Sequence, residues 1–429
     1  MALADLADWL DEQSRRETLW FAKRLSANDT LANNAHQAGP YIPKNILFTL
    51  FPSLDRPEDE NPEVRFKLQI DSHQGERREI RAVWYNNRRR GGTRDEARIT
   101  GFGGRSSPFL DPENTGALML LVVPPGDNTQ TSICRAWVCR NPSEEDLLED
   151  LIGPVEPGKG FLWAPEVPVG KDLVVPPPKE RSRCWLLENE IPEEWFKKFP
   201  SGAEIIKKTL EFRPLHGEIP DKRLLKRREC EYEIFQSVEE AVELPVIRRG
   251  FSSISDFVDR AQTVLQRRKS RSGKSLELHL KEIFLEDGLS EGRDFSSQAE
   301  SEPGKRPDFI FPSEAAYRDP SFPSEKLRML AAKTTCKDRW RQILNEADRI
   351  QVKHLLTLQE GVSENQFREM CGSGVRLVVP EGLHHAYPGA VRPELLSLEK
   401  FIKSLRLLGP KTGYYGESIA AEDFPNFHK

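Results

Sequence analysis

The chain has 429 residues, of which 31% are charged and 37% hydrophobic, and its formal net charge is −5 at pH 7. This length allows two or three domains whose cores need no stapling by disulfides or metals. The acidic balance argues against a protein that coats nucleic acid indiscriminately, and the lack of an apolar run of about 18 residues excludes a spanning helix.

The amino-terminal segment and the cysteines indicate where the chain works. Residues 1–17 are acidic and amphipathic and lack the basic start, apolar centre and cleavage site of a signal peptide. The six cysteines form no C-x-x-C pair, so we expect free, buried thiols in a reducing cytoplasm. The eight histidines show no H-x₃-H spacing, which argues against structural zinc.

Residues up to about 165 have the pattern of a β-rich domain. Strand-length segments that alternate or run apolar are Arg65–Asp71, Glu79–Tyr85, Gly116–Pro124 and Thr131–Val138. Many short strands separated by Gly- and Asn-containing turns predict a barrel or a sandwich.

The stretch Gly153–Pro178 is rich in proline and glycine, which favours a semi-extended connector. We therefore predict a first domain at residues 1–165, a connector at 166–186, a second domain at 187–407 and a loose tail at 408–429.

The second domain begins with helical periodicity and continues as alternating strands and helices. Apolar residues three and four apart predict helices at Glu193–Phe199, Ala203–Phe212, Arg223–Leu244, Ile254–Arg267 and Ser275–Leu289. Strands are predicted at Asp308–Phe311, Leu327–Thr334, His354–Leu358 and Val375–Val379, with helices at Lys337–Ile350, Asn365–Cys371 and Glu394–Leu407. This order predicts an α/β domain with a central sheet flanked by helices.

A candidate phosphodiester-cleaving site lies between Lys305 and Ala347. Asp308 opens a strand, Lys333 ends the next apolar strand, and Glu346 lies on the predicted helix that follows. Carboxylate oxygens suit Mg²⁺, and an ammonium group can orient water and stabilise charge near a phosphate. Glu277, on the preceding helix, could supply a further ligand. The pattern alone also fits a turn aspartate and a structural lysine.

The start of that predicted helix carries a second pattern. Thr335 to Asp338 resembles a capping box, with Asp338 at the third helical position. Arginine reads guanine through O6 and N7, and aspartate accepts from cytosine N4, so Lys337, Asp338 and Arg339 could read C:G pairs. Alternatively, Asp338 only caps the helix and the arginine only touches phosphate.

Two basic clusters stand out on the acidic chain. One holds Arg88, Arg89, Arg90, Arg94, Arg98 and Arg105, and the other holds Arg267, Arg268, Lys269, Arg271 and Lys274. Such clusters suit a protein that grips DNA at defined faces, although charge runs are also common on solvated surfaces.

Motifs along nearly the whole chain, up to about residue 405, resemble the EcoRII family of type II restriction endonucleases. In the first half they are RLSANDT, HQ-x-G-x-YIP, YNNR, TRDE-x-RIT and DPENTGAL; in the second half they are RRKSRSGKSLELHL, KRPDFIFPS, LRMLAAKTTCKDRWRQILNEADRI, TLQEGVS and GVRLVVP. The resemblance implies a B3-like effector domain joined to a PD-(D/E)XK nuclease core. It assigns catalysis to Asp308, Lys333 and Glu346, with Glu277 as a further acidic position, and base reading to Lys337, Asp338 and Arg339.

The resemblance also assigns effector-DNA contacts in the first domain to His36, Tyr41, Arg94, Glu96 and Arg98. Gly92 and Ala97 stand where the family has lysines, which predicts a weaker grip on phosphate.

The sequence therefore predicts a cytoplasmic, homodimeric, Mg²⁺-dependent endonuclease that cuts double-stranded DNA. Asp308 and Glu346 would hold the metal. The resemblance implies a CCWGG-like site, and an effector domain that binds a second copy of the site and relieves occlusion of the nuclease cleft. A cognate DNA methyltransferase would be the functional partner. Two alternatives stay open: a DNA-binding regulator with an inactive nuclease core, and a repair nuclease of the same fold.

Overall fold

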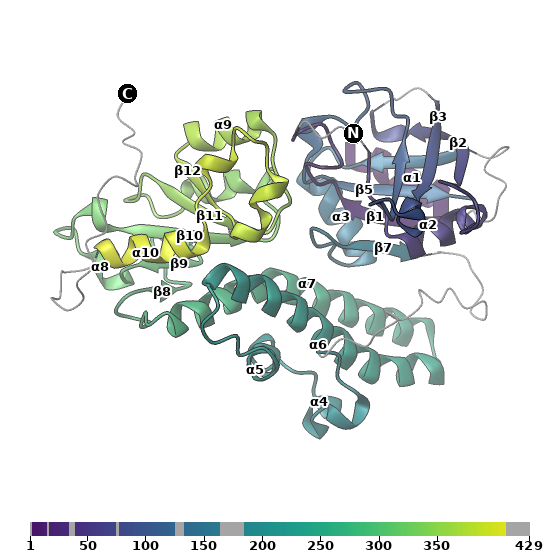
Figure 1. Ribbon diagram of the computed structural model, residues 1–429. Coiled ribbons are helices and arrows are strands. Elements are labelled where there is room, and N and C mark those ends of the chain that lie inside the picture. The colour runs from purple at the N-terminus through teal and green to yellow at the C-terminus, as the bar shows by residue number, and fades with distance from the viewer. Residues whose placement is uncertain are drawn as a thin grey trace.

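The computed structural model describes residues 2–14, 17–33, 39–73, 77–124, 133–163 and 184–408. Two β-sheets lie side by side, and two long helices run beneath both of them (Figure 1). Most of the predicted connector and tail fall outside the described residues. Among the described helices, none is long and apolar enough to cross a membrane.

The first sheet contains seven strands within the described residues, in the order β4-β3-β2-β6-β5-β1-β7. Their bounds are β1 Leu19–Arg24, β2 Glu63–Ile70, β3 Arg78–Tyr85, β4 Glu96–Thr100, β5 Leu118–Val123, β6 Ile133–Val138 and β7 Gly160–Trp163. Only the β2–β6 pair is parallel. The four predicted strands correspond to β2, β3, β5 and β6. The sequence pattern missed β1, β4 and β7.

Both faces of this sheet are covered, because β1 and β5 are buried along their whole length. One face forms a core with α2 (Lys44–Leu50), and the other packs beneath α1 (Ala2–Ser14) and α3 (Pro142–Ile152). Helix α3 begins where Asn141 accepts a hydrogen bond from the Glu144 amide (3.1 Å) and Pro142 occupies the first turn.

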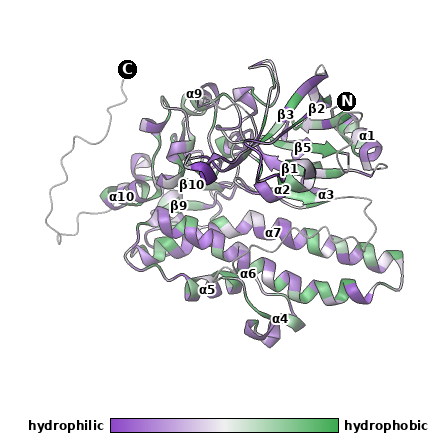
Figure 2. Cartoon of the chain, turned by 45° about the vertical axis from the view of Figure 1, so that its right-hand side comes forward, coloured by the Kyte–Doolittle hydropathy of each residue, from purple (hydrophilic) through white to green (hydrophobic). Residues whose placement is uncertain are grey.

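A helical layer joins the two sheets. It consists of α4 (Glu193–Lys197), α5 (Gly202–Phe212), α6 (Pro220–Arg249) and α7 (Ile254–Glu286). Hydrophilic and hydrophobic residues alternate along α6 and α7 (Figure 2). The prediction of two helices split near Arg267–Lys274 is wrong, because α7 runs through this segment. Its basic side chains pair with glutamates of α6: Arg267 with Glu243, Arg268 with Glu239 and Arg271 with Glu231.

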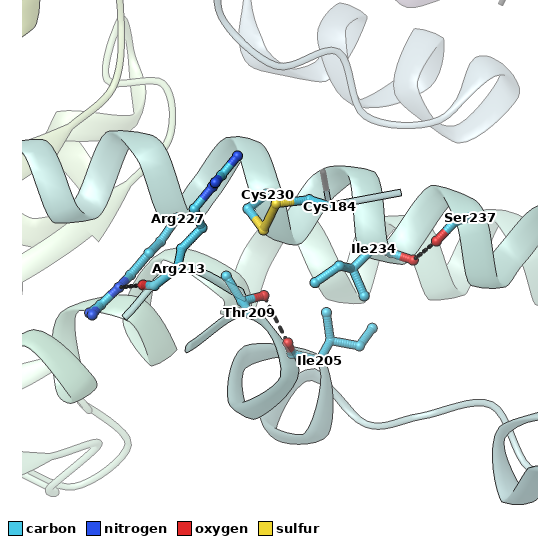
Figure 3. The surroundings of a disulfide bond; sticks show 8 residues. All are labelled: Cys184, Ile205, Thr209, Arg213, Arg227, Cys230, Ile234 and Ser237. Atoms are coloured by element: carbon cyan, nitrogen blue, oxygen red, sulfur yellow. Dashed lines mark hydrogen bonds between the residues drawn. A yellow bond between two sulfur atoms is a disulfide. The ribbon is translucent and has the colours of Figure 1, made fainter. Parts of the chain in front are cut away.

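The expectation that all six cysteines are free is also wrong. Cys184 and Cys230 form a disulfide, with their Cα atoms 5.2 Å apart, whereas the other four are free. Figure 3 shows the bond between the segment leading into the helical layer and α6. It lies in a small core with Trp195, Ile205 and Ile234. The 46 residues between the two positions hid this pairing from spacing arguments.

The second sheet has the order β12-β11-β10-β9-β8 among the described residues. The strands are β8 Ser296–Ser297, β9 Phe309–Phe311, β10 Arg328–Lys333, β11 Lys353–Thr357 and β12 Val375–Val378. Strands β10, β11 and β12 are mutually parallel, and β9 is antiparallel to β10. The other helices here are α8 (Glu314–Arg318), α9 (Glu364–Gly372) and α10 (Leu398–Leu408).

Strand β10 is the buried central strand that the sequence predicts. Met329 and Ala331 face one core, while Leu330 and Ala332 face another core that includes residues of α7 and α10. The chain is therefore a multidomain protein of mixed α/β structure, with its second sheet covered on both faces.

Candidate active site

Asp308 and Lys333 meet at one edge of the second sheet. Because β9 and β10 are antiparallel, the residue before β9 lies beside the end of β10. Asp308 Oδ2 accepts a hydrogen bond from the Ala332 amide (2.8 Å) and lies 3.8 Å from Lys333 Nζ. The carboxylate is buried, and the lysine side chain is 30% exposed. Asp308 is thus held by the backbone, while Lys333 keeps a head group that can reach a ligand.

Glu346 lies within range of the charges of this pair, but it is not part of an α-helix. The predicted helix Lys337–Ile350 is wrong: the segment forms a 3₁₀ helix, η8 (Arg339–Asn345), and Glu346 follows it in an extended conformation. Burial raises the pKa of Glu346; Lys333 lowers it and Asp308 raises it. These effects require Glu346 to lie near both residues.

Glu277, on α7, is the fourth predicted residue of this site. Burial, together with the charge of Asp308, raises the pKa of Glu277 to about 7. Gln298 links the two carboxyl groups, because its Nε2 lies 2.7 Å from Glu277 and 3.0 Å from Asp308 Oδ1. Gln298 had no signal in the sequence pattern, since it follows the two-residue strand β8.

The donor set fits a hard divalent cation that keeps several waters. Within the described residues, no group of three or more His, Cys, Asp or Glu side chains could hold a metal ion by itself. Magnesium, however, is commonly bound through one or two carboxylates together with water and substrate phosphate. The raised pKa values of Glu277 and Glu346 indicate carboxylates that a nearby cation would stabilise in their charged form. Asp308 and Glu346 could therefore hold such an ion.

The predicted base-reading residues Lys337, Asp338 and Arg339 follow directly after this site. The predicted capping box is absent, because no side chain caps the start of η8 at Asp338. Instead, Gln359 Oε1 accepts hydrogen bonds from the backbone amides of Cys336 (2.9 Å) and Lys337 (3.0 Å). The only sequence signal for Gln359 was its position in the TLQEGVS motif.

Helix α3 of the first domain lies against this segment. Arg339 forms ion pairs with Asp146 (3.2 Å) and Glu149 (3.7 Å) of α3. Lys269 of α7 pairs with Asp150 (2.6 Å) in the same way. A candidate DNA-reading arginine is thus engaged by carboxylates of another domain.

The first domain also forms a cavity with Lys333 of the candidate active site. Lys333, Thr335 and Arg339 line a cavity of about 320 Å³ whose other wall includes Asp146 and Glu149. A cavity of this size suits a small molecule and is far too small for duplex DNA.

Beside this cavity, a buried cluster of charged side chains joins the first domain to helices α6 and α7. Glu156, just beyond α3, pairs with Arg228 of α6 (3.0 Å) and Arg271 of α7 (2.8 Å), and its side chain is 13% exposed. Burial alone would raise the pKa of Glu156, but the two arginines lower it. This cluster, which we call the Glu156 clamp, is the most deeply buried ionic contact described between the two parts.

Three of the predicted effector residues lie together on the first sheet. Tyr41 forms an isolated bridge with Arg98, and Arg98 lies 3.4 Å from Glu96. Arg94 stacks over Tyr85 at 5.6 Å from the ring centre. Residue 36, the predicted histidine contact, lies outside the described residues.

The two positions that depart from the family pattern differ in their surroundings. Gly92 is exposed in the turn before β4, but a Cβ atom there would come within 2.5 Å of Asn87 Oδ1. Ala97 is fully buried in the core of the first domain. With this backbone, a side chain at position 97 points away from solvent, and one at position 92 would displace Asn87.

The two basic clusters also differ. Most of the side chains in the cluster at Arg267–Lys274 form ion pairs with α6, Asp150 or Glu156. In this arrangement they hold the helices and the first domain together. The one at Arg88–Arg105 lies around β4, where Arg89 stacks on Trp84 and Arg98 lines a cavity of about 360 Å³ with Arg81 and Tyr85.

Comparisons with known proteins find relatives of both halves of the chain. Residues 14–167 match the family described as restriction endonuclease EcoRII, N-terminal, and residues 235–402 match the family described as EcoRII C terminal. The type II restriction enzyme EcoRII of Escherichia coli is 46% identical over 431 residues, covering 97% of this chain and 100% of that protein.

Two solved structures of Ecl18kI, both metal-depleted, resemble parts of the chain. The complex with uncleaved, modified DNA has a TM-score of 0.43 at 19% identity and covers 54% of this chain and 85% of that one. The complex with uncleaved DNA has a TM-score of 0.41 at 19% identity and covers 53% and 84%.

Proposed function

The chain belongs to the EcoRII family of type II restriction endonucleases, and from this premise we propose that it is a Mg²⁺-dependent enzyme that hydrolyses double-stranded DNA at a CCWGG-like site. The observation that carries the proposal is the convergence of Asp308, Lys333 and Glu346 at one sheet edge in a chain related over its full length to a restriction enzyme. We further assign the second domain, residues 187–407, to the PD-(D/E)XK fold.

The chemistry follows from the environments of these residues. Asp308 and Glu346 hold the cation, which when bound supplies positive charge at the scissile phosphate and makes water more acidic. Lys333 donates hydrogen bonds to the phosphate or to the attacking water, and stabilises the negative charge that develops. Hydrolysis joins the water oxygen to phosphorus and breaks one phosphorus–oxygen bond of the backbone. Glu277 completes the acidic wall beside Asp308.

Sequence reading falls to Lys337, Asp338 and Arg339. Asp338 accepts from cytosine N4, and Arg339 donates to guanine O6 and N7, the pairings that identify a C:G pair in the major groove. Their position directly after β10 supports base contacts close to the scissile phosphate.

We assign the first domain, residues 1–165, to a B3-like fold that binds a second copy of the site through His36, Tyr41, Arg94, Glu96 and Arg98. The ion pairs of Arg339 and the small cavity between α3 and Lys333 support an inhibited arrangement, in which α3 occupies the space that substrate needs. We call this the closed arrangement. DNA bound to the first domain would favour movement of α3 away from the cleft, which couples cleavage to two-site binding.

Cutting both strands of a symmetric site needs two active centres, so we propose a homodimer. A cognate DNA methyltransferase, the partner of a restriction enzyme, would protect the host sequence. The connector at 166–186 and the tail at 408–429 complete the proposed division of the chain.

Replacing Asp308 with alanine tests the assignment. The variant should bind a CCWGG duplex with nearly unchanged affinity and lose cleavage in Mg²⁺, because the carboxylate serves the cation rather than the bases. Gel-shift and plasmid-cleavage assays measure the two properties separately. A fully active Asp308→Ala protein would overturn the assignment.

Sequencing the ends produced from plasmid DNA separates this proposal from its alternatives. One repeated sequence at the ends supports restriction. Scattered ends would favour a repair nuclease, and intact plasmid would favour a regulator that only binds.

A further inference from the structure

Gln359 occupies a buried position from which it contacts both the base-reading segment and the first domain. It follows β11 and is only 1% exposed. Its Oε1 accepts from the amides of Cys336 and Lys337, and its Nε2 donates to the Gly361 carbonyl (2.8 Å). The Tyr387 hydroxyl donates to the Gln359 carbonyl oxygen (2.9 Å). The side-chain amide is therefore held at both its oxygen and its nitrogen, and the backbone is held at its carbonyl oxygen.

The two amides that Gln359 accepts from are those at the start of the segment that carries Asp338 and Arg339. Cys336 and Lys337 directly precede Asp338, the residue at which η8 starts, and no side chain caps that start. Gln359 supplies, from 22 residues further along the chain, the acceptor that holds the Lys337 amide just before η8.

Bidentate recognition of a base requires the reading side chains to start from well-defined backbone positions, because their hydrogen bonds tolerate only about half an ångström of error. The backbone of Lys337 is anchored on one side by the central strand β10 and on the other by Gln359. Removing the second anchor would leave the buried side chains of Cys336 and Trp340 to hold the segment, without the hydrogen bonds that fix its backbone next to Asp338.

We propose that Gln359 is a positioning residue for sequence recognition: it sets the geometry of Asp338 and Arg339 without touching DNA. This inference rests on the reading role proposed above for those two residues. Discrimination between correct and altered DNA sites would then depend on Gln359 as well as on the residues of the reading motif.

The Gln359 side chain also packs against the first domain. Gly116 of the first domain lies so close that a Cβ atom there would come within 2.6 Å of the Gln359 amide atoms. Nearby, the Ala27 amide donates to the Glu360 carbonyl (2.8 Å), and Gln366 donates to the Glu113 carbonyl (2.9 Å). Gln359 thus has a matched control in Gln366, which contacts the first domain but is not bonded to the reading segment.

The test compares three variants: Gln359→Met, Gln359→Glu and Gln366→Met. Methionine keeps the length of the side chain and removes both hydrogen-bonding groups, whereas glutamate keeps the acceptor for the two amides. The measurement is the ratio of kcat/KM for a two-site CCWGG substrate to that for the same DNA with one altered C:G pair, together with binding of both duplexes without divalent metal.

Gln359→Met should lower this ratio at least about tenfold, the lower range of what one bidentate base contact contributes. Gln359→Glu and Gln366→Met should stay within about threefold of the parent ratio. An unchanged ratio in Gln359→Met, or an equal loss in Gln366→Met, would overturn the inference.

Hydrogen exchange keeps the inference testable if Gln359→Met does not fold. In the unaltered protein the Cys336 and Lys337 amides should exchange slowly, and exchange as fast as in an open loop would contradict the proposed anchoring. Arg339→Ala, measured in parallel, separates the two levels of the argument. If Arg339→Ala keeps full discrimination, the reading role itself fails. If it loses discrimination while Gln359→Met does not, only the role of Gln359 fails.

Discussion

Weakening the contact between α3 and the nuclease domain should activate the enzyme on DNA that carries a single site. The perturbation is the double substitution Asp146→Asn and Asp150→Asn, which removes the carboxylates facing Arg339 and Lys269. Glu149 stays intact, because it also pairs with Arg24 (2.7 Å) inside the first domain. The change therefore acts on the interface and spares the fold of α3.

The expected magnitude follows from the exposure of the two pairs. The Asp146 and Asp150 side chains are 57% and 54% exposed, so each pair is worth about 0.2–1 kcal/mol. Together they contribute about 0.4–2 kcal/mol to the closed arrangement. Their loss should raise the ratio of open to closed protein by roughly 2- to 30-fold. While the closed arrangement dominates, the single-site cleavage rate rises by the same factor.

The assay measures initial cleavage rates on plasmids with one and two sites at low and moderate ionic strength. Added salt should speed single-site cleavage by the parent more than by the double variant, because salt screens the pairs that the variant lacks. Asp55→Asn combined with Glu58→Gln, two exposed changes elsewhere in the first domain that remove the same charge, is the matched control and should behave as the parent. An unchanged single-site rate in a folded double variant would refute the reasoning.

Two further predictions concern stability. His354 is buried, and desolvation lowers its pKa to about 3, below its ordinary value of 6.5. As the pH falls, the imidazole is therefore protonated in the unfolded chain before it is protonated in the folded protein. Through this group, the free energy of unfolding should drop by about 2 kcal/mol between pH 7 and pH 5. Urea titrations should show a weaker pH dependence in His354→Phe, and identical dependence in the two proteins would contradict the assignment. The disulfide between Cys184 and Cys230 closes a loop of 46 residues, which corresponds to as much as about 4 kcal/mol in the chain-entropy treatment. Cys184→Ser should melt below the oxidised parent, and reductant should remove the difference; a parent indifferent to reductant would show that the bond does not form.

The meeting of Asp308 and Lys333 in the candidate active site was predictable because the two residues lie at the ends of strongly patterned strands. The apolar run of β10 ends at Lys333, and Asp308 opens β9, so strand assignment alone brings these two residues together. Their approach depends on one antiparallel pairing between neighbouring strands. Glu346 was found on the right segment, although the segment is a 3₁₀ helix.

The features that the sequence did not reveal depend on contacts between distant segments. The apolar spacing of residues 337–350 fits an α-helix, but the backbone amides at its start bond to Gln359 and a shorter helix forms. No local pattern can show that an arginine in this segment meets Asp146 of another domain, or that Cys184 meets Cys230. Helix α3, in contrast, could have been predicted from Asn141 followed by Pro142 and Glu144, an ordinary start signal.

The ion pairs between the first domain and the rest of the chain differ in strength. The Glu156 clamp is buried, whereas the pairs that Asp146 and Asp150 of α3 form are exposed. Removing one partner of a buried ion pair costs about 3–5 kcal/mol, several times the worth of an exposed pair. An opening force therefore separates Asp146 and Asp150 from their partners long before it separates Glu156 from Arg228 and Arg271. Opening of the interface should consequently begin at α3, while the Glu156 clamp and the backbone hydrogen bond from Ala27 to Glu360 still hold the first domain to the second.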